Sequence, residues 1–312
     1  MSNHIALQSW QRYMEEHSLR EVRSKIALLK AVCDADSASE IDCYIERVLC
    51  HPTLSRRENF RVDYRGIAES TRSAWAQEEA SKRPKVDVPA MRRRYGLEGI
   101  NIADQFIRPE SFFYRCGLVF IPDANNIIGA RSIVDGGAYR GESAVVMRCH
   151  HPNAQVHAFE PDARNFSVLT KVARETKFGS GITPVQVGLG ASTSVASLTG
   201  AGHEVQLSRT GNRGCIQVTS IDNYAVANRI AIGFFKLDLE GVEFDAVKGA
   251  TVTLKRDRPA FSVAIYHNPV DFLEIGPFIA SSGMNYHLMV RHLHPQLSSF
   301  FGEFMLIGYP LN

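Results

Sequence analysis

From Arg131 onward, short apolar runs rich in β-branched residues alternate with segments in which apolar residues recur every three to four positions. The first pattern predicts buried strands and the second predicts helices. Seven runs are predicted as strands, namely residues 132–135, 155–160, 182–187, 232–238, 261–267, 286–290 and 303–308. Because parallel strands need long crossover connections, this alternation predicts an α/β fold with a mostly parallel sheet covered by helices.

The last two predicted strands follow each other closely, which predicts an antiparallel pair at the end of the sheet. Between Val195 and Val218 no helical pattern is clear, and we expect a hairpin or a long loop there.

The first third of the chain has a different pattern of apolar and polar residues. Ile26, Leu29 and Val32 follow a helical spacing, and a further short helix is predicted over 42–49. Two prolines and several charges over 81–89 predict a linker. We therefore expect a helical N-terminal extension over residues 1–99 and a catalytic domain over residues 100–312.

Composition narrows the class of protein. Hydrophobic residues make up 45% and charged residues 22% of the 312 residues, which predicts an ordered globular protein. The 35 basic and 33 acidic residues nearly cancel, so charge provides no reason to expect nucleic acid or an anionic membrane as partner.

The compartment is predicted from the cysteines and the N-terminus. None of the six cysteines has the C-x-x-C spacing of a zinc or redox site, so reduced thiols are expected. The first residues contain no apolar signal-peptide core, and no segment is apolar enough to span a bilayer. We therefore expect a cytoplasmic protein.

A glycine-rich turn follows the first predicted strand, in the sequence IVDGGAYRG (133–141). Gly136 and Gly137 allow a sharp turn and close approach to a ligand, and the following helix start offers free N–H groups. Asp135 stands at the carboxyl edge, where open parallel sheets bind their ligands. Taken alone, an ordinary glycine-rich turn explains the motif equally well.

An acidic residue ends the second predicted strand. Glu160 lies 25 residues after Asp135, and its two carboxylate oxygens suit the vicinal hydroxyls of a ribose. A dinucleotide fold also uses such an acid, but Ala138 occupies the position of its second glycine, and Asp135 would put negative charge near a diphosphate. Both features favour a ligand with an amino acid end.

Charged residues alternate along the segment FFKLDLEGVEF (234–244). Strand alternation places Lys236, Asp238 and Glu240 on one side, where burial without partners would be costly. We assign Asp238 and Glu240 to the functional edge of the sheet, and Lys236 and Glu243 to local salt bridges.

A histidine ends the next strand, in FSVAIYHNP (261–269). The usual pKa of histidine lies near neutrality, so His267 is a candidate general base. A hydrogen-bonded structural histidine is the alternative.

Taken together and in this order, the motifs resemble those of the FkbM family of S-adenosylmethionine-dependent methyltransferases. They are DGGAYRG (135–141), FEP (159–161), KLDLEGVE (236–243), KGA (248–250) and IYH (265–267). The resemblance covers about residues 131–267, and the segment 106–122 is similar to the lead-in of some members. It implies the class I methyltransferase fold, a Rossmann-like seven-stranded sheet whose last strand is antiparallel.

The resemblance also implies a function, which is methyl transfer from S-adenosylmethionine to a hydroxyl oxygen of a small molecule or sugar. The expected cofactor-binding residues are Asp135, Gly136, Gly137, Ala138, Gly141, Glu160, Pro161, Gly188 and Asp238, and the expected catalytic residues are His267, Glu240 and Asp238. His267 would remove the acceptor proton, oriented by Glu240 or Asp238. A divalent metal held by these three residues is the less favoured alternative.

Two other functions compete with this interpretation. A non-catalytic module could keep the fold and the cofactor, and an NAD-dependent oxidoreductase could use a similar edge of the sheet. Retention of Asp238, Glu240 and His267 disfavours the first, and the glycine pattern disfavours the second. The expected partner is a small-molecule or sugar acceptor, and a homo-oligomer is possible.

Overall fold

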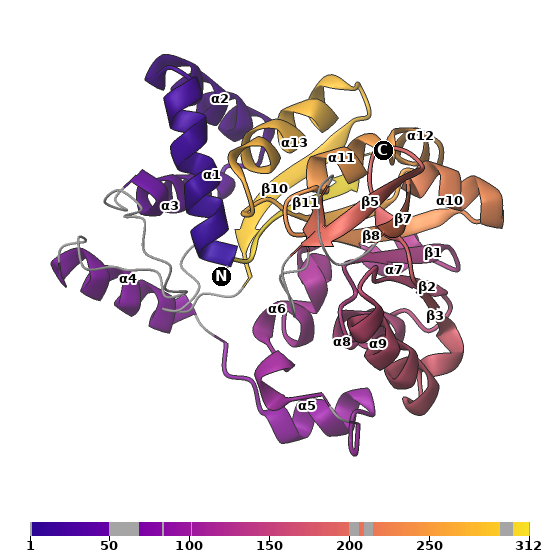
Figure 1. Ribbon diagram of the computed structural model, residues 1–312. Helices are drawn as coiled ribbons and strands as arrows, with labels where there is room; N and C mark the ends of the chain where they lie inside the picture. The colour runs from indigo at the N-terminus through magenta and orange to yellow at the C-terminus, as the bar shows by residue number, and fades with distance from the viewer. Residues whose placement is uncertain are drawn as a thin grey trace.

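A seven-stranded sheet forms the centre of the computed structural model (Figure 1), which describes residues 2–49, 69–82, 84–100, 102–199, 206–208, 215–293 and 302–311. Its strands are β1 (Ser132–Gly136), β2 (Val156–Phe159), β3 (Ile182–Val185), β8 (Ile232–Leu237), β9 (Ala260–Ala264), β10 (Tyr286–His292) and β11 (Phe304–Pro310). They lie in the order β10-β11-β9-β8-β1-β2-β3. All seven predicted strands are present, and β11 is antiparallel to both neighbours, as predicted.

The position of one strand and the end of another add detail to the prediction. The antiparallel strand β11 lies between β9 and β10, so the pair β10–β11 ends the sheet as predicted. Strand β9 ends at Ala264, so Tyr266 and His267 follow it in a loop. The strand stops because Ile265 is the last residue whose N–H reaches β11, where it donates to the carbonyl of Phe304 (3.0 Å).

Helices cover both faces of the sheet. The elements beyond residue 100 are α6 (Pro109–Phe112), α7 (Ala124–Ile128), α8 (Glu142–His150), α9 (Ala163–Glu175), α10 (Ile221–Asn228), α11 (Glu243–Lys248), α12 (Thr251–Asp257) and α13 (Pro269–Ser281), with 3-10 turns at 104–106, 115–120 and 179–181. From the centre, the chain proceeds outward through β2 and β3 on one side and through β9 on the other. Right-handed crossovers therefore place α8 and α9 on one face and α12 and α13 on the opposite face, as Figure 1 shows.

A second, smaller sheet follows β3. It contains β4 (Gly188–Leu189), β5 (Ser194–Thr199), β6 (Gln206–Ser208) and β7 (Cys215–Thr219). Strand β5 pairs antiparallel with both β6 and β7, so the hairpin expected in this region is present.

The N-terminal region is helical, as predicted. Its helices are α1 (Ser2–Glu16), α2 (Leu19–Val32), α3 (Ser37–Leu49), α4 (Glu69–Lys82) and α5 (Val88–Tyr95). The predicted linker is shorter than expected, because α4 continues to Lys82 and α5 begins at Val88, where Pro89 occupies a first-turn position that needs no N–H.

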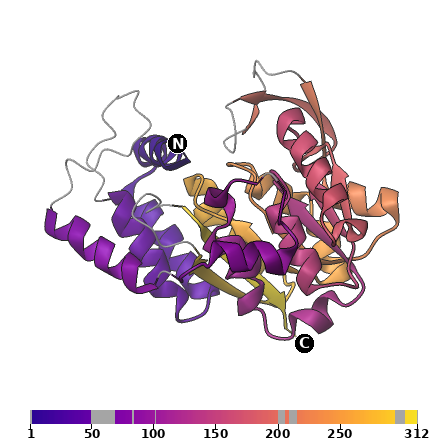
Figure 2. The same cartoon turned by 90° about the horizontal axis from the view of Figure 1, so that it is seen from below.

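Helices α1 to α3 lie beside the β10–β11 side of the sheet (Figure 2). Trp10 and Tyr44 are buried against Phe272 of α13, and the Tyr44 ring also packs edge-on against Phe304 of β11 (5.0 Å between ring centroids). These rings share one hydrophobic core with the sheet. The boundary at residue 99 stays a prediction.

The segment between α2 and α3 also protects the edge of the sheet. The N–H of Asp34 donates to the carbonyl of Leu288 (2.9 Å), and the N–H of Val290 donates to Ser37 Oγ (2.8 Å). Two backbone groups of β10 that face away from β11 are thereby satisfied, which makes this edge strand less available for pairing with another chain. Within the ranges given above, no helix combines the length and apolarity needed to cross a membrane.

Candidate active site

The strand order reverses at the junction of β1 and β8, because the chain continues from β1 towards one edge and from β8 towards the other. In parallel sheets, ligands bind beyond the carboxyl ends of the strands at such a reversal. The glycine turn after β1 lies directly against the end of β8. A Cβ on Gly137, whose φ is +71°, would lie 1.9 Å from the carbonyl oxygen of Asp238. The turn therefore requires glycine because of this close backbone approach.

Three charged side chains connect β1 and β8. Asp135 is fully buried, accepts from Ser143 Oγ (2.6 Å) and lies 3.5 Å from Lys236 Nζ. Lys236 Nζ also donates to the carbonyl of Gly137 (3.1 Å) and lies 3.9 Å from Asp238. The expected local salt bridge of Lys236 is present with Asp238, and a closer partner, Asp135, lies on the neighbouring strand. This pairing holds the glycine turn in place, and a contact of Asp135 with the cofactor stays a prediction.

Glu160 is buried at the carboxyl end of β2. Its Oε1 accepts from the N–H of Asp162 (2.8 Å). Burial raises the pKa of Glu160 to about 7, and the charge of Asp162 adds to the increase, although hydrogen bonds partly offset it. Additional hydrogen-bond donors would stabilise the charged form of this buried carboxylate, and the hydroxyl groups of a ribose are such donors.

The other predicted cofactor residues gather around the same turn. Ala138 is buried and donates its N–H to the carbonyl of Phe159 (2.9 Å), and Gly141 starts α8 with a φ of +98°. Pro161 follows Glu160 and is half-buried. Gly188 lies in β4, where the side chain of the next residue, Leu189, lies against Gly136. The structure thus brings these positions to one edge of the sheet.

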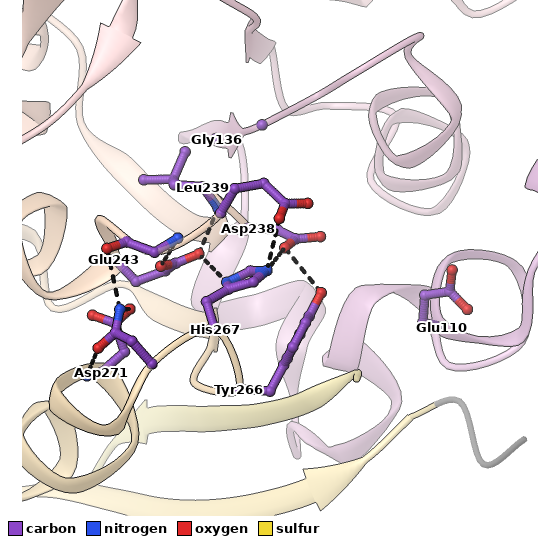
Figure 3. A network of polar contacts seen from close by, with 12 residues as sticks. Glu110, Gly136, Asp238, Leu239, Glu243, Tyr266, His267 and Asp271 are labelled. Atoms are coloured by element: carbon purple, nitrogen blue, oxygen red, sulfur yellow. Dashed lines mark hydrogen bonds and ion pairs between the residues drawn. The ribbon is translucent and has the colours of Figure 1, made fainter. Parts of the chain in front are cut away.

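The three predicted catalytic residues meet at the same edge. Asp238 and Glu240 follow β8 and His267 follows β9. His267 Nε2 lies 3.6 Å from Asp238 Oδ1 and 3.5 Å from Glu240 Oε2, and Figure 3 shows the imidazole directed towards Asp238. Tyr266 donates its hydroxyl to Asp238 Oδ1 (3.3 Å). Glu240 has a φ of +58°, and this turn brings its carboxylate back towards His267.

Glu243 orients His267 from the other side. Its Oε1 lies 2.8 Å from His267 Nδ1 and accepts from the N–H of Leu239 (2.6 Å), while its Oε2 accepts from the N–H of Gly241 (2.9 Å). The expected local salt bridge of Glu243 is therefore wrong. Its partner is His267 from the loop after β9, because the tight turn after β8 directs the Glu243 carboxylate inward, where it is fully buried.

The pKa values of His267 and Asp271 are both shifted by the charges around them. Burial lowers the pKa of His267, but the charges of Glu243, Glu240 and Asp238 outweigh burial and raise it well above the usual value. Burial and the charge of Glu243 raise the pKa of Asp271, whose carboxyl accepts from the N–H of Phe244 (2.9 Å). The surroundings of His267 are therefore strongly acidic and stabilise a positive charge.

Sequence reasoning missed several charged residues near this site. Glu303 precedes β11, and burial together with the charges of Glu110 and Asp238 raises its pKa well above the usual value. Burial also raises the pKa of Glu142 to about 7, although Arg108 lowers it. The sequence signal for this region is the segment 106–122, which carries Arg108 and Glu110 and resembles the lead-in of some family members.

A known domain family matches the part of the chain that carries this site. The sequence model of the methyltransferase FkbM domain matches residues 135–292. A structure of methyltransferase FkbM from Methylobacillus flagellatus KT is similar with a TM-score of 0.46 and 22% identity, over 85% of this chain and 65% of that chain. This chain thus spans about two thirds of the length of that protein.

Other solved structures show weaker likeness. A methyltransferase from Geobacter sulfurreducens has a TM-score of 0.42 and 13% identity, over 78% of this chain and 98% of that chain. The O-methyltransferase from Bacillus cereus in complex with SAH has a TM-score of 0.41 and 10% identity, over 77% of this chain and 100% of that chain. No curated protein sequence matched. Because the domain match covers just over half of the 312 residues, the chain belongs to the FkbM methyltransferase family.

Proposed function

We propose that this chain transfers a methyl group from S-adenosylmethionine to a hydroxyl oxygen of a small molecule or sugar. One observation carries the proposal: Gly137 of the glycine turn lies against the backbone of Asp238, so the expected cofactor turn adjoins the group formed by Asp238, Glu240 and His267. Methyl donor and acceptor must be neighbours for transfer, and binding on the two sides of this junction would make them neighbours.

The residues at the turn fit S-adenosylmethionine. The cofactor supplies a methyl group already activated on a sulfonium. Glu160 supplies a buried carboxylate for the ribose hydroxyls, and Gly136 and Gly137 keep the turn free of side chains. The protein then has to align the acceptor and draw off its proton.

Asp238, Glu240 and His267 are proposed to contact the acceptor. Their oxygen and nitrogen atoms can accept a hydrogen bond from a hydroxyl group, which orients its oxygen towards the methyl group. In the reaction the S–CH₃ bond breaks, the O–CH₃ bond forms, and the hydroxyl proton leaves on the side of this group and finally passes to solvent. The specific role of His267 as the base stays a prediction.

Replacing Glu160 by alanine should weaken cofactor binding. Loss of hydrogen bonds to a charged group costs roughly 1.5–3 kcal/mol, or about 10- to 150-fold in Kd. Titration calorimetry with S-adenosylhomocysteine measures the change. The variant Glu175→Ala, which removes a carboxylate from the outer end of α9, should bind as the wild type does. Equal affinity of Glu160→Ala and wild type would contradict the ribose assignment.

Cofactor affinity should also depend on pH. The pKa of Glu160 is raised to about 7, and only the charged carboxylate accepts both ribose hydroxyls. Raising the pH deprotonates the group, so the affinity for S-adenosylhomocysteine should increase about tenfold between pH 6 and pH 8. Glu160→Gln cannot titrate and should show a flat profile over the same range. A dependence that persists in Glu160→Gln would assign the titration to another group.

The proposed reaction is tested by mass spectrometry of small molecules. Extracts of cells lacking the gene are incubated with the purified protein and S-adenosylmethionine carrying an isotopically labelled methyl group. A product that gains one labelled methyl supports the proposal and identifies the acceptor. Binding of S-adenosylhomocysteine without any labelled product would favour the non-catalytic module, and binding of NAD in its place would favour the oxidoreductase.

A further inference from the structure

We infer that Asp238, Glu240 and His267 bind one divalent metal cation, an inference that rests on the proposed function because the cation would act on the acceptor hydroxyl. One ligand atom from each residue can be chosen so that all three lie within 4.8 Å of one another. Two of the residues come from the loop after β8 and one from the loop after β9, so the fold itself assembles the set.

The distances within this group fit a shared cation better than direct hydrogen bonds. His267 Nε2 lies 3.5 Å from Glu240 Oε2 and 3.6 Å from Asp238 Oδ1, beyond the usual range of about 2.7–3.2 Å for a hydrogen bond. Nitrogen and oxygen ligands lie about 2.0–2.2 Å from a metal ion, so ligands of one ion are about 3–4 Å apart. Both distances from His267 Nε2 fall in that interval.

The imidazole provides a second, independent observation. The His267 side chain is only 3% exposed, and its Nε2, directed at the two carboxylates, has no hydrogen-bond partner in the part of the chain that the structure describes. Burying such a nitrogen without a partner is costly. A cation between the three groups would take up its lone pair and also balance the two carboxylates.

Glu243 supports this arrangement from behind the imidazole. Its contact with His267 Nδ1 (2.8 Å) favours the tautomer that carries its proton on Nδ1, which leaves the Nε2 lone pair free for a metal. A carboxylate behind a ligating histidine is the usual outer partner in metal sites. Glu243 is thus a positioning residue, held in turn by the N–H groups of Leu239 and Gly241.

The ligand set indicates both the class of metal and its use. Two carboxylate oxygens and one imidazole nitrogen suit a divalent ion such as Mn²⁺, which accepts both ligand types. An octahedral ion bound by these three side chains would have further coordination positions for water or for the acceptor oxygen. A cation beside the hydroxyl lowers its pKa, so its proton passes to solvent as the methyl group moves from sulfur to oxygen, with no change of oxidation state.

The test measures Mn²⁺ binding directly. Protein treated with a chelator and dialysed is titrated with MnCl₂, and free Mn²⁺ is followed by electron paramagnetic resonance. We expect one bound Mn²⁺ per wild-type chain. Asp238→Asn and Glu240→Gln should each weaken binding at least tenfold, and Glu243→Gln should weaken it about 10- to 100-fold. The matched control Asp245→Asn removes the same charge from an exposed position on α11 and should bind as the wild type does.

Two results would overturn the inference: no stoichiometric Mn²⁺ on the wild type, or equal affinity in the wild type, Asp238→Asn and Glu240→Gln. Melting curves establish that each variant is folded, and the wild-type stoichiometry decides the matter even if a variant is not. Methyl transfer is measured in parallel with and without chelator. Transfer that persists in chelator, without Mn²⁺ binding, refutes the metal and keeps the function. Mn²⁺ binding by a chain that methylates no acceptor keeps the site and refutes the function.

Discussion

Replacing Tyr44 by alanine should lower the free energy of unfolding by about 3–5 kcal/mol, the usual cost of deleting a fully buried aromatic ring. Tyr44 is 0% exposed and stacks on Phe272 with 4.2 Å between ring centroids. Its hydroxyl accepts from Trp10 Nε1 and donates to the carbonyl of Tyr266, both at 3.1 Å. Removal leaves a cavity at the point where helices α1 and α3 meet the main sheet.

Urea denaturation of purified protein measures this loss, and two further variants separate its causes. Tyr44→Phe keeps the ring and leaves two buried polar partners unsatisfied, so it should cost about 1–3 kcal/mol. Val226→Ala, at a position that is 63% exposed, should stay within about 0.5 kcal/mol of the wild type. A Tyr44→Ala variant as stable as Val226→Ala would mean that the N-terminal helices do not share the core.

Replacing His267 by alanine should reduce turnover roughly 100-fold or more, the scale of losing a group that handles the acceptor proton. The affinity for S-adenosylhomocysteine should stay almost unchanged, because the glycine turn and Glu160, which are expected to hold the cofactor, lie at the ends of β1 and β2 while His267 follows β9. Steady-state kinetics, calorimetry and melting curves of the same sample together measure the effect.

A matched histidine provides the control for this experiment. His287 also lies near a carboxylate, 3.7 Å from Asp34, but it is on β10 and its side chain is 32% exposed. His287→Ala should therefore retain wild-type turnover. If His267→Ala melted as the wild type does and still turned over at the wild-type rate, its catalytic role would be refuted. If activity and melting temperature fell together, the histidine would be structural.

The order of the elements was determined by the sequence alone. Strands and helices differ in the period of their apolar residues, and this period is local, so all seven main strands could be predicted from short segments. The reversed direction of the last strand could be predicted because the connection between β10 and β11 is short in the sequence. The exact ends of the strands could not be predicted in the same way. Backbone pairing with the distant strand β11, for example, decides where β9 stops.

The meeting of the catalytic candidates was also predictable. Parallel strands end at one edge of the sheet, so residues at those ends converge although they are far apart in sequence. Asp238, Glu240 and His267 do meet there, within 4.8 Å. The motifs that the family shares lie at these same strand ends, and the domain match over 135–292 confirms the family to which they were assigned.

Tertiary structure alone decided which charges pair. Besides its local partner Asp238, Lys236 pairs with Asp135 on β1, and Glu243 pairs with His267 after β9. The close approach of the glycine turn to the loop after β8 brings these partners together. No local sequence pattern encodes that approach. Burial then makes each pairing obligatory, since an unpaired buried charge is too costly to retain.

The packing of the N-terminal helices was likewise decided by the fold. Their spacing predicted helices but not the surface that they cover, because an amphipathic face specifies only that burial occurs. In the structure, Ser37 and Asp34 take the open hydrogen bonds of β10, and Tyr44 reaches the carbonyl of Tyr266, next to His267. These contacts join residues more than 200 positions apart, and only the closed core brings them within reach.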